Sequence, residues 1–141
     1  MRVKTVLSAL VISAAVLAAE EAFDLKINML KLNAEVGEAR EAMIRNEKEA
    51  ALDAFRRLKA DANDLLSNKS KIESLLPADK KNKADIAVES ARKIAQNVDI
   101  IEDAFGENRR NLSPLKRQAT AQRAYTSIEV ACFHCHNLVR D

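Results

Sequence analysis

The chemically distinctive residues of this 141-residue chain gather at its C-terminal end, in the stretch ACFHCHNLVRD, residues 131–141. Both cysteines and both histidines of the sequence lie there within five positions. Cys132, Cys135 and His136 spell C-x-x-C-H, the pattern typical of c-type haem attachment. Residues three and four apart share one face of a helix, so the two sulfurs and the imidazole would project to the same side. Both thiols could then form thioethers with the haem vinyl groups while His136 reaches the iron.

Three other uses of these residues compete with haem attachment. A structural zinc site needs four ligands in a tetrahedron, which five consecutive helical residues cannot supply without a second chain. A thioredoxin-type dithiol would follow a strand, and the sequence predicts none. A chance cluster in the core would leave a buried imidazole without a partner. His134 lies about 200° around the helix from His136 and is interpreted as a solvated position rather than a ligand.

The elements that must position this motif are helices. Two Gly and two Pro in the whole chain, with abundant Ala, Leu, Glu, Lys and Arg, favour long helices and few tight turns. Apolar residues recur at intervals of three and four in four segments, each flanked by charge. The four stripes are Leu25, Met29, Leu32, Val36, Ala39 and Met43; Ala51, Phe55, Leu58, Ala62 and Leu65; Ala87, Ala91, Ile94, Val98, Ile101 and Phe105; and Ala121, Tyr125, Ile128, Cys132, Cys135 and Val139.

The breaks between these segments carry helix-end signals. Asn46 offers an N-cap to the second helix, and the polar stretch around Pro77 makes the second connection the longest. The third helix should end near Gly106, and the fourth should start with Ser113 as its cap and Pro114 as its first residue. The sequence therefore predicts an all-α fold, an antiparallel four-helix bundle in up-down-up-down order.

The predicted bundle also indicates which methionine would be the second iron ligand. In this topology the first and fourth helices are antiparallel neighbours, so the start of one lies beside the end of the other. Met29 then lies at the level of His136, and the haem would sit between these two helices. Met43 lies 14 residues further on, about 21 Å along the axis at roughly 1.5 Å per residue, and cannot meet the same iron. The alternative for Met29 is an ordinary methionine that fills the core.

The N-terminal segment has the features of a secretory signal. Residues 1–19 combine a short basic start with an uncharged apolar run of about 15 residues, shorter than the roughly 20 that span a membrane. An uncleaved membrane anchor is the alternative. Cleavage would leave residues 20–141 as a single domain with 21 basic and 21 acidic residues. With no surplus of positive charge and five aromatic residues, the composition argues against nucleic-acid binding.

These features together resemble the class II c-type cytochromes, which include cytochrome c-prime. Members of that family typically end C-x-x-C-H-x-x-(Tyr or Phe)-Arg, whereas here Val139 replaces the aromatic residue and Arg140 stands where the family has its arginine. The stretch FDLKINMLKLN is also similar to the opening of the b-type four-helix-bundle cytochrome of the bacterial periplasm, whose methionine ligand matches Met29. Low-spin members of class II likewise use an early methionine.

The resemblance implies a periplasmic carrier of single electrons, not an enzyme, with one covalent haem c. Its haem-binding residues would be Cys132 and Cys135, and its iron ligands His136 and Met29. The expected walls of the pocket are Leu25, Leu32, Ile128 and Val139, and Arg140 would pair with a haem propionate. Expected partners are redox proteins with a modest basic patch, and a homodimer is common in the family. Two alternatives remain, a five-coordinate protein of the cytochrome c-prime type that binds nitric oxide or carbon monoxide, and a helical interaction or metal-buffering module without haem.

Overall fold

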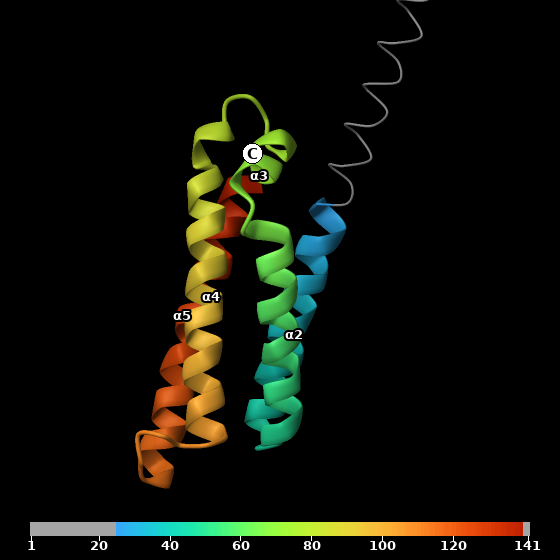
Figure 1. Ribbon diagram of the computed structural model, residues 1–141. Coiled ribbons are helices and arrows are strands. Elements are labelled where there is room, and N and C mark those ends of the chain that lie inside the picture. The colour runs from blue at the N-terminus through green and yellow to red at the C-terminus, as the bar shows by residue number, and fades with distance from the viewer. Residues whose placement is uncertain (1–24, 140–141) are drawn as a thin grey trace, which may run out of the picture.

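The computed structural model describes residues 25–139, with side chains as far as residue 137. The first helix occupies residues 25–44 of this range. It is followed by α2 (Lys48–Leu66), α3 (Lys69–Leu75), the short 3-10 helix η1 (Lys81–Lys83), α4 (Ala84–Phe105) and α5 (Pro114–Val139). No strand occurs in the described range, so the predicted all-α class is confirmed. Figure 1 shows the four long helices lying along one another, each running opposite to the long helix before it.

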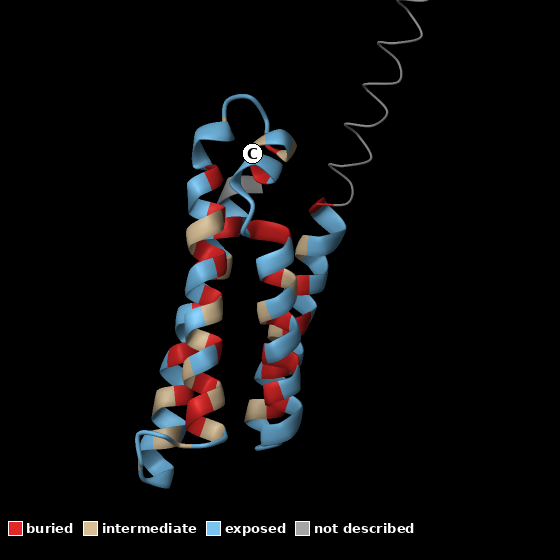
Figure 2. Cartoon of the chain, viewed as in Figure 1, coloured by how far each residue is buried: buried red, intermediate tan, exposed pale blue. Residues whose placement is uncertain are grey.

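Most residues of the predicted apolar stripes lie in the core or pack against it. Figure 2 shows buried positions recurring along the length of each long helix. The largest side chains that are completely enclosed come from α2, α4 and α5 and are Phe55, Leu58, Ile94, Val98, Ile101 and Ile128. Met29, Val36, Met43, Phe105 and Cys132 are partly buried and pack against this core. Because an apolar residue every three or four positions keeps one side of a helix facing its neighbours, the sequence pattern alone selects the buried faces.

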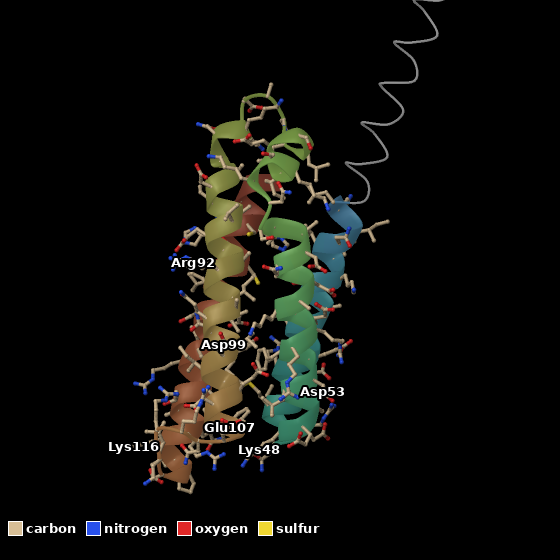
Figure 3. The ribbon with its side chains drawn as sticks, viewed as in Figure 1. Lys48, Asp53, Arg92, Asp99, Glu107 and Lys116 are labelled. Carbon is tan, nitrogen blue, oxygen red and sulfur yellow. The ribbon has the colours of Figure 1, made fainter. Side chains whose placement is uncertain are left out.

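Ion pairs bridge the outer edges of the helices. Between α2 and α4, Lys59 lies 2.5 Å from Asp99 and Arg56 lies 2.7 Å from Glu102. Figure 3 labels Asp99 on α4. Exposed pairs of this kind contribute about 0–1 kcal/mol each, so they favour one register of the helices without accounting for the stability of the bundle.

The turn between the first helix and α2 differs from the sequence prediction. Glu47, not Asn46, occupies the N-cap position of α2, and no side chain caps that end. Asn46 instead has φ 59° and donates its backbone N–H to the Met43 carbonyl at 3.1 Å. The Glu47 N–H donates to the Ala42 carbonyl at 2.9 Å. Asparagine tolerates this left-handed conformation better than most residues, so Asn46 ends the first helix instead of starting the next.

The second connection contains more structure than its polar composition indicates. Within it, α3 begins at the N-cap Asn68, whose side chain accepts the Lys71 backbone N–H at 3.0 Å. Ile72 and Leu76 are buried against the bundle, and Pro77 follows directly after the end of this helix. Two apolar residues four positions apart are too few for a periodicity count to detect, yet they are enough to fold one short helix onto the bundle.

In the third connection, α4 ends and α5 begins at the predicted residues. Gly106 is the C-cap of α4, and α5 begins at Pro114, with the Ser113 carbonyl accepting the Arg117 N–H at 2.9 Å. The Arg117 side chain donates to the carbonyl oxygens of the last residues of α4, including Phe105 at 3.0 Å. This contact satisfies carbonyls that have no partner within their own helix and places a positive charge at the negative end of the helix dipole.

Candidate haem site

The C-x-x-C-H motif lies in the last turns of α5, with two of its residues directed into the bundle. Cys135 is buried and Cys132 is half-buried, while Phe133 and His134 between them are exposed. His136 is exposed although it lines the same cavity as the two cysteines. The helix thus separates the inward positions of the motif from its outward ones. His134 lines a different groove, between α4 and α5. It is exposed, in agreement with its interpretation as a solvated residue.

A small cavity brings together the four residues that the sequence singled out. Met29 reaches it from the first helix, and Cys132, Cys135 and His136 reach it from α5. Leu32, Asn33, Leu66 and Ile94 complete its lining, and its volume is about 20 Å³. A neighbouring void of about 10 Å³ is bordered by Leu25, Met29 and Cys135 among others. The start of the described chain and the end of α5 therefore meet at one end of the molecule (Figure 1).

Of the other predicted pocket residues, only some border these two voids. Leu25 and Leu32 are 7% and 6% exposed and border the two voids, as expected for walls. Ile128 is completely buried in the core and borders neither void. The Val139 side chain and Arg140 lie outside the described residues, as does the predicted signal segment, residues 1–19. Met43 lines a separate groove with Arg40 and is not part of this site.

Two polar residues of the site were not anticipated from the sequence. Asn33 lines the cavity beside Met29, and Ser90 of α4 is buried and interacts through its hydroxyl with the Cys135 thiol. Ser90 occupies the inward face of α4, three residues after Ala87 and four before Ile94. A polar residue on the apolar face of a predicted helix can be recognised in the sequence. The sequence does not show which residue of the neighbouring helix it contacts.

The electrostatic environment holds both thiols in the protonated form. Burial raises the pKa of Cys132 to about 11, with Cys135 and Glu129 adding to the effect. Burial likewise raises the pKa of Cys135 above the ordinary thiol value. Redox-active C-x-x-C pairs show the opposite behaviour, because they depend on a lowered thiol pKa. The two cysteines form no disulfide.

The donor set fits haem c in kind. Two thiols, an imidazole and a thioether sulfur border one apolar cavity at the junction of two helices. The cavity volume does not fit, because ligands of this size occupy roughly 300–1,000 Å³. Haem binding therefore requires the first helix, which carries Met29, to move apart from α5, which carries Cys132. No three His, Cys, Asp or Glu side chains of the described chain gather as a metal-binding group.

No family model, curated protein or solved structure matches this chain. Across the residues that the structure describes, no helix is both long enough and apolar enough to cross a membrane.

Proposed function

We propose that this chain is an exported monohaem c-type cytochrome that carries single electrons and is not an enzyme. Its helices would form an up-down-up-down bundle with the haem between the first helix and α5. One observation carries the proposal, namely that Met29 lines the same cavity as Cys132, Cys135 and His136 although more than 100 residues separate them. The chain would act in the periplasm and exchange electrons with redox partner proteins, without binding nucleic acid.

Each residue of the site has a distinct part in this proposal. Cys132 and Cys135 would hold the haem through thioethers, and His136 and Met29 would be the ligands of its iron. The bound haem supplies reversible one-electron chemistry at iron, and a histidine–methionine pair raises the reduction potential. Leu25 and Leu32 would exclude water from the porphyrin edge, since both are more than nine-tenths buried.

Covalent attachment is tested first. The full-length chain is produced in a host with a c-type haem maturation system and stained for haem after denaturing electrophoresis. We expect staining of the wild type and its loss in the Cys132→Ser, Cys135→Ser double variant, because a thioether survives denaturation and a coordination bond does not. A wild-type band without stain, from a culture in which a control c-type cytochrome stains, would refute the proposal.

The distal ligand is tested by comparing two methionines of the same helix. Met29→Ala should convert the ferric spectrum from low spin to high spin and lower the reduction potential, because the thioether sulfur is lost from iron. Met43→Ala is the matched control and should leave both unchanged, since Met43 lines a groove elsewhere in the molecule. If the wild type is already high spin and binds carbon monoxide, the five-coordinate gas-binding alternative replaces electron transfer.

A further inference from the structure

A groove of about 620 Å³ lies between the end of the first helix, the end of α4 and the start of α5. It lies at the end of the molecule opposite to the last turns of α5, near Lys48 in Figure 3. Its volume falls within the roughly 300–1,000 Å³ of small-molecule sites and is far larger than either void beside the cysteines. Met43, which the haem proposal does not use, borders this groove.

Apolar side chains that reach solvent border the groove. Ile44 is 76% exposed and Leu115 is 77% exposed, the two highest values among the exposed large apolar residues of the described chain. Both line the groove, together with the half-buried Met43 and Phe105. Single exposed apolar residues are ordinary, but several that converge on one hollow mark a surface that binds something.

The charged residues that line the groove all have one sign. Arg40, Lys48 and Arg117 line it, and no carboxylate does. The Arg117 guanidinium is held by the carbonyls at the end of α4. Arg40 and Lys48 form no ion pair with any carboxylate of the described residues, whereas the nearby Arg45 pairs with Glu41 and Glu47. The groove therefore combines apolar walls with two cations that no acidic side chain neutralises.

We propose that this groove binds a small amphipathic anion, a molecule with an apolar body and a carboxylate, sulfonate or phosphate head. The body would lie on Met43, Ile44 and Leu115, and the head would be bound by Arg40 and Lys48. The proposal is independent of haem, because Met43 is 14 residues, about 21 Å, along the helix from Met29.

The test is a fluorescence titration of the full chain with 8-anilinonaphthalene-1-sulfonate, an apolar anion that becomes emissive when it leaves water. We expect saturable binding of one molecule per chain. Arg40→Gln and Lys48→Gln should each weaken it roughly three- to tenfold, the range expected for one partly exposed charge-assisted contact. Lys81→Gln removes a cation of η1 that is also exposed but lies outside the groove, and it should change nothing. Circular dichroism shows whether each variant is folded.

Competition identifies the ligand class. Decanoate should displace the dye, and decanol, which has the same apolar body without the charge, should displace it at least tenfold less well. Equal displacement by both, or unchanged dye affinity in folded Arg40→Gln and Lys48→Gln, would overturn the proposal. It would also be overturned by binding to phosphatidylglycerol vesicles without binding of monomeric decanoate, or by sedimentation showing that a second copy of the chain covers the groove.

Discussion

Glu35 gives the sharpest prediction of how this fold responds to pH. It lies on the first helix facing α2, is 4% exposed, and its Oε2 has no hydrogen-bond partner among the described residues. The charged groups that face it are Asp61, Lys31 and Arg57, and Lys31 lies 2.6 Å from Asp61. Burial, reinforced by the hydrogen bond to Asp61 and by its negative charge, raises the pKa of Glu35 to about 7.

The sign of the effect follows from proton linkage. Between the ordinary carboxyl pKa of 4.5 and about 7, the unfolded chain loses the Glu35 proton while the folded chain keeps it. The free energy of unfolding therefore falls as pH rises, by about 1.4 kcal/mol per pH unit and by about 3 kcal/mol in total as an upper limit. Asp61 acts in a lower window, because the Lys31 hydrogen bond lowers its pKa and the resulting stability is lost only as pH falls below about 4.

Glu35→Gln removes the ionisation and keeps the shape of the side chain. Urea denaturation at pH 5 should give a free energy of unfolding within about 0.5 kcal/mol of the wild type. At pH 8 the variant should be more stable than the wild type by up to about 3 kcal/mol. Glu41→Gln is the control, since Glu41 is an exposed residue of the same helix that pairs with Arg45 at 3.6 Å, away from Glu35. If wild type and Glu35→Gln lose stability equally between pH 5 and pH 8, Glu35 is ionised in the folded chain and the reasoning fails.

Five further substitutions test core packing, backbone conformation and a buried acid, each by urea denaturation. Phe55→Ala should cost about 3–5 kcal/mol because Phe55 is completely buried, whereas Phe133→Ala, at 68% exposure, should cost about 0.5 kcal/mol or less. Gly37→Ala should stabilise the first helix by about 0.5–1 kcal/mol because the new Cβ meets nothing within 4 Å. Gly106→Ala should destabilise the folded protein because the new Cβ would lie 2.7 Å from the backbone oxygen of Glu102. The Arg109 N–H and the Arg110 side chain lower the pKa of Asp103, so Asp103→Asn should lower the urea midpoint at pH 7, and this effect should shrink as the pH falls below about 4.

The local features of this protein could be predicted from its sequence. The helical stripes, the end of α4 at Gly106 and the start of α5 at Pro114 depend on residues within a few positions of one another. The shared face of Cys132, Cys135 and His136 likewise follows from the geometry of a single helix. The prediction of Asn46 as the N-cap of α2 is wrong because an asparagine side chain suits both an N-cap and a left-handed position at the end of a helix.

The features that join distant segments were decided by the tertiary structure. Glu35 has the sequence context of a surface residue, and only packing against α2 makes it a buried acid. The basic groove combines Arg40, Lys48 and Leu115 from three separate segments, and Ser90 meets Cys135 across two helices. Local propensity and periodicity describe how one segment orients its own side chains. Which groups lie opposite, and so which charges are left without a partner, depends on how whole helices pack against one another.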